Sequence, residues 1–195
     1  MGQSTLYLSF GTHGGIWRGR PNNQPNSGPL VKETCPVDDT LHQAAGNNNT
    51  TSGGSFIVMA SGNLGHIVRS VRYGANNGDW TLSKTQANPL YAMIYGSGHW
   101  VAAGDNDTIL TSSDNGANWT TKNSKWPGSQ WRWGAYGNGR FVLVGLNGRI
   151  TYSTDNGSTW SKASSGSTED FTGVAYSPTF DSFAACGSNH TIVIV

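Results

Sequence analysis

Residues 136–145 read YGNGRFVLVG, and residues 95–104 read YGSGHWVAAG. The two stretches lie 41 residues apart, and the same offset continues outward, for example from Ile109 to Ile150. Self-similarity at a fixed period near 40 residues is typical of stacked supersecondary units. The chain therefore contains a repeated structural unit.

Three further copies of the unit are weaker. They run from Ala175 to Ile192, from Phe56 to Trp80, and from Tyr7 to Ile16. In the best copy, turn residues separate four short strand-like runs, at 132–136, 140–144, 149–153 and 159–162. This pattern predicts an all-β, propeller-like array of about five small blades, each an antiparallel unit of four strands. The first and last blades are incomplete, since the first copy begins at the second strand of the unit and the last ends at the third. A β-solenoid is the alternative, but four separate strands per unit favour blades.

The composition agrees with strands and turns and excludes several classes of protein. Of the 195 residues, 27 are glycine and only 12% are charged, with a formal net charge of +1. Without a basic excess we expect no nucleic-acid partner, and without an apolar run of about 18 residues we expect no membrane insertion. Glu33 and Glu169 are the only glutamates, which argues against a helical bundle. The N-terminus shows no secretory signal pattern.

A motif recurs between the third and fourth predicted strands. Residues 113–119 read SDNGANW and residues 154–160 read TDNGSTW, with Ser112 and Ser153 at the leading position. The motif resembles the Asp-box, or BNR repeat, which occurs in sialidases, sortilin-like receptors and many bacteriophage tail proteins. Gly78-Asp79-Trp80 is a degenerate third copy.

The physical role of this motif is structural. An aspartate can accept backbone N–H groups of the turn that follows it, glycine supplies a positive φ, and tryptophan covers the apolar gap beside the turn. The residues assigned to this role are Asp114, Gly116, Trp119, Asp155, Gly157 and Trp160.

The loops between second and third strands emerge on the opposite face, where a ligand could bind. They carry His13, His66, Asp105, Asp107, Arg149 and His190, which should gather on one rim. A neutral, hydrogen-bonding rim suits sugar hydroxyls; the alternative is a set of solvated turn tips. Trp126, in the linker 123–133, is a candidate exposed ring for sugars or protein partners. Alternation places Trp131 and Trp133 on one face of the next strand, in the core.

The resemblance to sialidases implies an arginine triad, a Tyr–Glu couple and an acidic residue. Arg18, Arg69 and Arg149 fall near corresponding third-strand positions, but Glu33 lies in an insertion and Glu169 in a linker. We therefore predict no catalytic residues and keep a sialidase-like glycoside hydrolase as an alternative. The histidines lack zinc-site spacing, so no metal or cofactor is predicted.

Two further features concern the ends of a single domain covering 1–195. Residues 21–52 are rich in proline and asparagine and are expected to form an irregular insertion. The terminal strand 191–195 would leave an apolar edge, so we expect another strand to pair with it, from 21–52 or from a neighbouring subunit. Cys35 and Cys186 would approach each other in a closed ring; the alternative is a buried free Cys186 and an unrelated Cys35 in a loop.

The resemblance to phage Asp-box proteins implies a non-enzymatic structural or adhesive component of a bacteriophage virion, in the tail, a fibre or the capsid surface. Its partners would be other virion proteins or copies of itself, through 191–195 and 21–52, and host surface glycans. The protein would be made in the host cytoplasm. A further alternative is an assembly factor that docks on another protein through Trp126 and the proline-rich segment.

Overall fold

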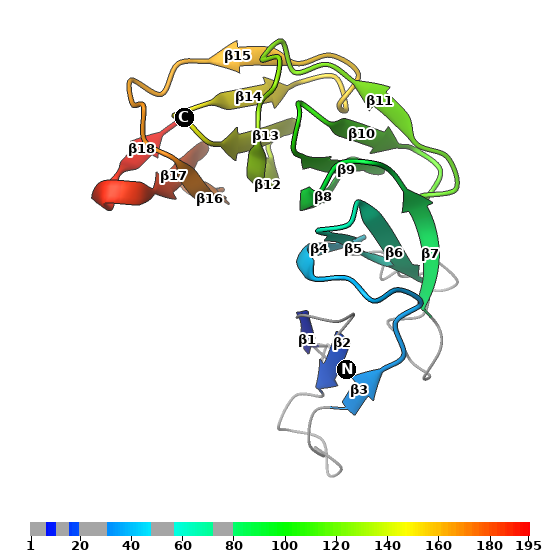
Figure 1. The fold of residues 1–195 in the computed structure, drawn as a ribbon. Helices are drawn as coiled ribbons and strands as arrows, with labels where there is room; N and C mark the ends of the chain where they lie inside the picture. Colours follow the sequence, from blue (N-terminus) through cyan, green and yellow to red (C-terminus); the bar gives the residue numbers. More distant parts are fainter. Residues whose placement is uncertain (1–6, 11–15, 20–30, 48–56, 72–79) are drawn as a thin grey trace.

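The computed structural model describes residues 7–10, 16–19, 31–47, 57–71 and 80–195. Their strands form five antiparallel sheets (Figure 1), and the one helical element in these ranges is a 3₁₀ turn, Ser188–His190. The all-β prediction is confirmed.

Each sheet follows the chain order of its strands, so each is a simple meander. Blade 1 contains β1 (Tyr7–Phe10), β2 (Ile16–Gly19) and β3 (Val31–Glu33). Blade 2 contains β4 (Leu41–Gly46), β5 (Val58–Gly62), β6 (His66–Ser70) and β7 (Trp80–Thr85). Blade 3 contains β8 (Leu90–Gly96), β9 (His99–Gly104), β10 (Ile109–Ser112) and β11 (Thr120–Lys122). Blade 4 contains β12 (Trp131–Gly137), β13 (Arg140–Gly145), β14 (Ile150–Ser153) and β15 (Ser161–Ala163). Blade 5 contains β16 (Phe171–Ser177), β17 (Ser182–Gly187) and β18 (Ile192–Ile194).

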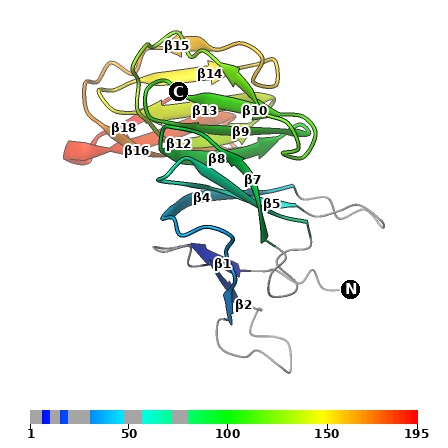
Figure 2. The same ribbon diagram turned by 45° about the vertical axis from the view of Figure 1, so that its right-hand side comes forward.

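The blades are arranged along an open arc. Figure 1 shows β4, β8, β12 and β16 on the inner side of the arc and β7, β11 and β15 on the outer side, and Figure 2 shows the sheets stacked beside one another. Blades 1 and 5 lie at opposite ends (Figure 1). The first and last blades have three strands, as predicted.

The core lies between consecutive blades. We call the face of a sheet that turns toward the next blade its forward face, and the opposite face its rear face. Ile109 on the forward face of blade 3 packs with Trp131 and Phe141 on the rear face of blade 4, and all three are fully buried. Ile150 packs with Phe183 of blade 5 in the same way. Burying each such side chain contributes about 1.5–3 kcal/mol, so packing between blades is the main stabilising contact.

Two glycines allow consecutive inner strands to pack closely. A Cβ atom added to Gly96 would lie 2.1 Å from Cγ of the Tyr136 ring, and one added to Gly137 would lie 2.0 Å from Cγ of Tyr176. The tyrosine of one inner strand thus covers the glycine that ends the previous inner strand. Ser177 occupies the corresponding position of blade 5.

The segment 21–52 is not irregular throughout, contrary to the prediction. It contains β3, the last strand of blade 1, and β4, the first strand of blade 2. Pro36, the proline of this segment that the structure describes, lies between β3 and β4 and so does not interrupt either strand. β18 pairs with β17 and with neither β3 nor β4, so the described strands of this segment do not pair with the terminal strand; pairing with a neighbouring subunit stays a prediction.

Trp131 and Trp133 do not share a face, which corrects the alternation argument. The pairing register of β12 shifts between them, because Arg132 is an extra, unpaired residue. Trp131 is buried against blade 3, whereas Trp133 packs on the side of blade 5. A one-residue bulge reverses the orientation that strict alternation predicts.

The two cysteines are free and lie in blades at opposite ends of the described arc. Cys35 follows β3 and is half-buried, and Cys186 lies in β17 (Figure 1). Cys186 is exposed, not buried as its strand position suggested, because none of the sheets in the described ranges covers that face of blade 5.

Candidate functional site

The motif turns of blades 3 and 4 are closed by hydrogen bonds within the turn. Backbone N–H of Asn118 donates to Oδ1 of Asp114 (2.9 Å), and Ser112 Oγ both donates to Asp114 Oδ1 (2.8 Å) and accepts from the N–H of Gly116 (2.9 Å). Gly116 has a φ of 79°, which a residue with a side chain rarely adopts. Ser153, Asp155, Gly157 and Thr159 repeat these bonds in blade 4.

These hydrogen bonds engage the carboxylates of Asp114 and Asp155 within their own turns. Trp119 donates its Nε1–H to Ser83 of blade 2, and Trp160 is buried with its Nε1–H donated to the Gly157 carbonyl. The Asp114 turn therefore fastens blade 3 to blade 2. The arrangement supports a structural role for Asp114 and Asp155.

We predict that these turns make stability depend on acidic pH. The Asn118 backbone N–H, followed by the Asn118 and Ser112 side chains, lowers the pKa of Asp114 to about 2. At Asp155, partial burial opposes the shift, but hydrogen bonds from Thr159 and Ser153 outweigh it and lower the pKa. Because these carboxyls bind fewer protons in the folded state, their stabilisation is present above about pH 5 and is lost as the pH falls toward about 2.

Thermal melts between pH 7 and pH 2 measure this effect. Asp114→Asn should lower the melting temperature at pH 7 and flatten its decline below pH 5. Ser113→Ala, at an exposed residue of the same turn, is the control and should reproduce the unmodified profile. A wild-type profile from Asp114→Asn would contradict the role assigned to this carboxylate.

The predicted rim residues are spread over successive blades and do not form one cluster. His13 lies outside the described residues. His66 Nδ1 lies 3.1 Å from Oδ2 of the buried Asp39. Arg149 donates to Ser129 Oγ (3.0 Å), and His190 is exposed at the end of the arc. Of the predicted set, Asp105 reaches the inner side of the arc.

Trp126 is not the exposed ring that was expected. It is half-buried against the cluster between blades 3 and 4, and its Nε1–H donates to the carbonyl of Ile150 (3.2 Å). Lys162 Nζ lies 4.1 Å from the ring centroid. Ser124 Oγ accepts the backbone N–H of Trp126 in a tight turn that folds the ring onto blade 4.

A repeated β-bulge creates the most polar group on the inner side. The first strand of each of blades 2 to 5 has one extra residue relative to its partner strand, within His42–Gln43 and at Tyr91, Arg132 and Thr172. Bulges re-aim side chains and are frequent next to binding sites. Three of them bring side chains from separate blades into contact.

We call His42, Tyr91, Asp105 and Arg132 the inner cluster. The rings of His42 and Tyr91 meet edge to face with centroids 4.8 Å apart, and Arg132 Cζ lies 4.3 Å from the Tyr91 ring centroid. Tyr91 donates its hydroxyl hydrogen to Asp105 Oδ2 (3.2 Å). Arg132 Nη1 lies 3.7 Å from Asp105 Oδ1, which has no hydrogen-bond partner among the described residues.

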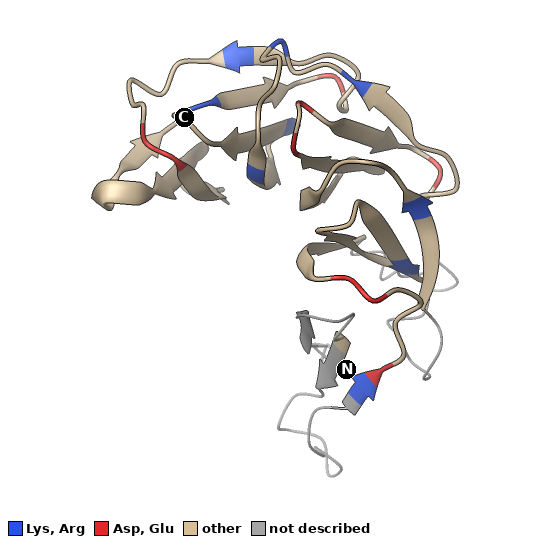
Figure 3. Ribbon diagram, in the orientation of Figure 1, with Lys and Arg blue, Asp and Glu red and all other residues tan. Residues whose placement is uncertain are grey.

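Two glutamines extend the inner cluster. Gln130 Oε1 accepts from Arg132 (3.2 Å), and Gln43 bridges inner strands by donating to the Gly134 carbonyl (3.0 Å) and accepting from the N–H of Met93 (3.3 Å). Charges elsewhere on the described arc are sparse and scattered (Figure 3). The group therefore combines hydrogen-bond donors, acceptors and aromatic rings with little net charge.

The electrostatics of the inner cluster favour a neutral histidine. Partial burial beside Tyr91 is the largest influence on His42 and lowers its pKa, although Asp39 opposes this and Arg132 adds to it. At neutral pH, His42 can thus donate from one ring nitrogen and accept at the other.

Sequence reasoning found Asp105 and missed His42, Tyr91 and Arg132. Each of the three follows the buried residue that opens its inner strand: Leu41, Leu90 and Trp131. Aligning the copies at these apolar residues was the available signal, but the extra residue that turns each side chain inward is visible only in the strand pairing.

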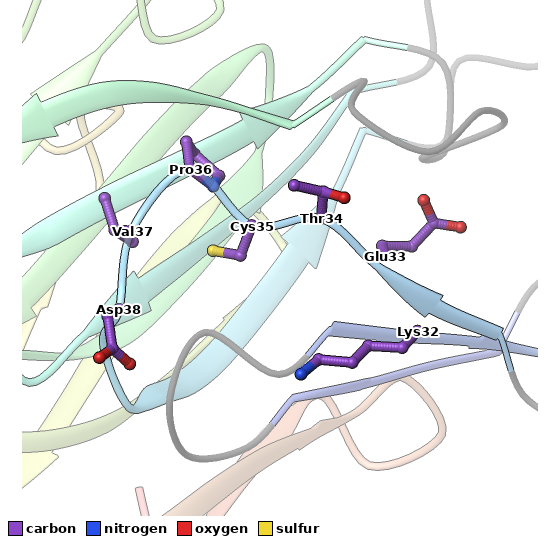
Figure 4. Close-up of a pocket in the computed structure, with 7 residues that line it drawn as sticks. All are labelled: Lys32, Glu33, Thr34, Cys35, Pro36, Val37 and Asp38. Atoms are coloured by element: carbon purple, nitrogen blue, oxygen red, sulfur yellow. The ribbon is translucent and has the colours of Figure 1, made fainter.

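A separate pocket of about 440 Å³ lies beside β3 (Figure 4). One continuous run, Lys32–Asp38, lines it. Burial is the main cause that raises the pKa of Cys35, so this thiol is a poor nucleophile at neutral pH. Among the described residues, no other strand or loop contributes to the lining, and we assign the pocket no role.

Of the three arginines that the sialidase resemblance singles out, the Arg18 side chain lies outside the described structure, and Arg69 and Arg149 do not converge. Arg69 donates to the carbonyl of Asn115, and Arg149 donates to Ser129, in different blades. Within the described ranges, no group of three or more His, Cys, Asp or Glu could hold a metal ion. The same ranges contain no helix of the length and apolarity that spanning a membrane requires.

Comparison with known proteins identifies the fold. No family model matches the chain, and no curated protein matches it. Among solved structures, a chain of a nidogen/laminin complex superposes with a TM-score of 0.70 at 11% identity, over 98% of this chain and 74% of that one. The designed protein Ika8 superposes with a TM-score of 0.65 at 12% identity, over 99% of this chain and 58% of that one. YCF48 bound to a D1 peptide superposes with a TM-score of 0.60 at 14% identity, over 96% of this chain and 63% of that one. The nidogen and YCF48 chains are β-propellers, so this chain has a propeller fold and spans only part of these chains.

Proposed function

We propose that the protein is a non-enzymatic structural and adhesive component of a bacteriophage virion, and that its inner cluster binds a neutral glycan of the host surface. The observation that carries the binding role is the convergence of three bulge side chains from three blades. Their phenol, imidazole and guanidinium groups, with the amides of Gln43 and Gln130 beside them, match sugar hydroxyls, and Tyr91 and His42 offer ring surface for a sugar face.

The virion assignment rests on the Asp-box-like turns and on a surface with little charge, both of which resemble phage tail proteins. The hydrolase alternative finds less support. Glu169 accepts a hydrogen bond from Asn189 of blade 5, and Glu33 lies in blade 1, so neither glutamate adjoins Tyr91 of the inner cluster.

An array of bacterial surface oligosaccharides, probed with purified protein, tests the adhesive role. Arg132→Met should weaken binding about 10-fold or more, because a charge-assisted hydrogen bond and its contact with Tyr91 are lost. Arg140→Met is the matched control, since Arg140 lies 5.4 Å from Phe183 and outside the inner cluster. Equal binding by the two variants would show that the glycan binds outside the inner cluster.

Two more results would count against the proposal. Release of new reducing ends from a bound oligosaccharide would favour the hydrolase. An antibody that detects the protein in a phage lysate but not in the particles purified from it would contradict the virion role. The glycan result would not be affected.

A second candidate is a protein-docking factor. One of the similar structures is a nidogen/laminin complex, and another is YCF48 bound to a D1 peptide. Phe180, on the hairpin of blade 5, is 80% exposed and would suit a protein partner. Retention of a virion protein on immobilised wild-type chain, and its loss with Phe180→Ser, would favour this candidate.

A further inference from the structure

Several turns of the chain contain an asparagine followed by glycine. In such a pair the backbone nitrogen of the glycine can attack Cγ of the asparagine side chain, because glycine has no side chain that shields the nitrogen. Four pairs lie in the described residues, at 115–116, 138–139, 147–148 and 156–157. A fifth, at 77–78, lies outside them. The surroundings of each glycine decide which pair can react.

In three of the four described pairs the glycine is buried and its N–H is hydrogen-bonded. The N–H groups of Gly116 and Gly157 each donate to the leading serine of their own motif turn, both at 2.9 Å. The N–H of Gly148 donates to the carbonyl of Glu169 (2.8 Å). Each of these nitrogens must first be released by local opening of the structure before it can react.

Gly139 differs from these three glycines. It is exposed, and its N–H has no hydrogen-bond acceptor among the described residues. Asn138 and Gly139 form the two-residue turn between β12 and β13, with φ values of 42° and 74°. A turn of this kind hydrogen-bonds its flanking residues, here Gly137 and Arg140, and leaves its central N–H groups to solvent. A Cβ atom added to Gly139 would meet no atom within 4 Å, so water reaches this nitrogen.

The side chain of Asn138 connects blade 4 to blade 5. Its Nδ2 donates to both carboxylate oxygens of Asp181, at 2.9 Å each, and the Tyr176 hydroxyl donates to Asp181 Oδ1 (2.8 Å). Tyr176, followed by Asn138, lowers the pKa of Asp181, so this carboxyl is ionised at neutral pH. The amide of Asn138 therefore faces a negative charge.

We propose that Asn138 is a modification site, at which the side-chain amide is lost through a succinimide. The Gly139 nitrogen gives up its proton and attacks Asn138 Cγ. The new C–N bond closes the ring, the Cγ–Nδ2 bond breaks, and Nδ2 leaves as ammonia with that proton. One water molecule then opens the ring at either carbonyl carbon. The product is aspartate, or isoaspartate in which the main chain runs through Cγ.

The modification changes the contact between the two hairpins. Either product replaces a donor to Asp181 by a carboxylate, so a hydrogen bond is lost and two like charges face each other. Isoaspartate also adds Cβ to the main chain of a two-residue turn. Arg140 Nη2 lies 3.6 Å from Asp181 Oδ1 and offsets part of the repulsion. The contact between blades 4 and 5 is therefore weakened, and this inference is independent of the proposed glycan site.

Peptide mapping by mass spectrometry of folded protein, kept at mildly alkaline pH, tests the selectivity. Asn138 should convert about 10-fold faster or more than the asparagines of the other three described pairs, because their glycines must first be released by local opening. In protein unfolded by urea all four should convert at similar rates, since the fold no longer protects any of them. Equal rates in the folded protein, or slower conversion at Asn138, would overturn the proposal.

The melting temperature of Asn138→Asp, compared with that of Asn138→Ser, measures the structural consequence. Serine is the matched control because Ser97 occupies the equivalent turn of blade 3, with a φ of 49°. Both variants lose the amide donor, but aspartate adds a charge, so Asn138→Asp should melt at the lower temperature. Combining each variant with Asp181→Asn should abolish the difference. Equal melting temperatures of the two single variants would overturn the weakening of the contact.

Discussion

Replacing Gly96 by alanine is expected to lower the free energy of unfolding by about 3 kcal/mol, at the upper end of the cost of overpacking a core. The added Cβ would lie 2.1 Å from Cγ of the Tyr136 ring, and the ring is held against Phe141, at a centroid distance of 4.7 Å. Gly96 ends β8 without a positive φ, so alanine meets no backbone strain there. The loss therefore measures the contact between inner strands.

Urea denaturation of a double-mutant cycle isolates this contact. Tyr136→Ala removes the ring, so Gly96→Ala combined with Tyr136→Ala should cost less than the two single losses together, by about 2 kcal/mol. Ser177→Ala, at the corresponding position that no ring covers, should change stability by less than about 0.5 kcal/mol. Equal, small effects at positions 96 and 177 would show that the ring does not restrict Gly96.

Replacing Trp131 by alanine is expected to cost about 4 kcal/mol. Trp131 is fully buried between blades 3 and 4 and donates its Nε1–H to Oδ1 of Asp107 (3.3 Å). The substitution leaves a large cavity in the packing between two blades and removes one of the two side-chain donors to Asp107 Oδ1, the other being Ser124 Oγ. Urea denaturation followed by the fluorescence of the remaining tryptophans measures the change.

Trp133 provides the matched comparison, because it is two residues away on the same strand and half-buried on the opposite face. Trp133→Ala should cost about half as much as Trp131→Ala. Trp131→Phe should keep most of the packing and cost about 1.5 kcal/mol through the lost hydrogen bond. Equal costs for the two alanine variants would contradict the bulge that separates their faces.

The repeat made the architecture predictable from sequence. The 41-residue spacing of Ile109 and Ile150 reflects one structural position, a forward-face residue buried under the next blade, so the sequence period and the packing period coincide. The hydrogen bonding of the motif turns was also predictable, since Ser112 and Asp114 close the turn through local contacts within four residues.

The inner cluster was not predictable, for a physical reason. A bulge depends on how one strand pairs with another, and nothing in the run Leu90-Tyr91-Ala92 marks Tyr91 as the extra residue. The same effect separated Trp131 from Trp133. Trp126 was misjudged because its exposure depends on a side-chain hydrogen bond to the next blade. Short strands such as β3 gain their order from neighbouring strands more than from composition.

The bulge of the inner strands also bears on how proteins of this kind can diversify. The extra position holds four different kinds of side chain in one molecule, within His42–Gln43 and at Tyr91, Arg132 and Thr172. It has no cross-strand partner, and these residues lie outside the apolar clusters between blades. Under the proposed binding role, substitutions at one residue per blade would change recognition while the scaffold stays constant, and a combinatorial library at these positions would sample new specificities.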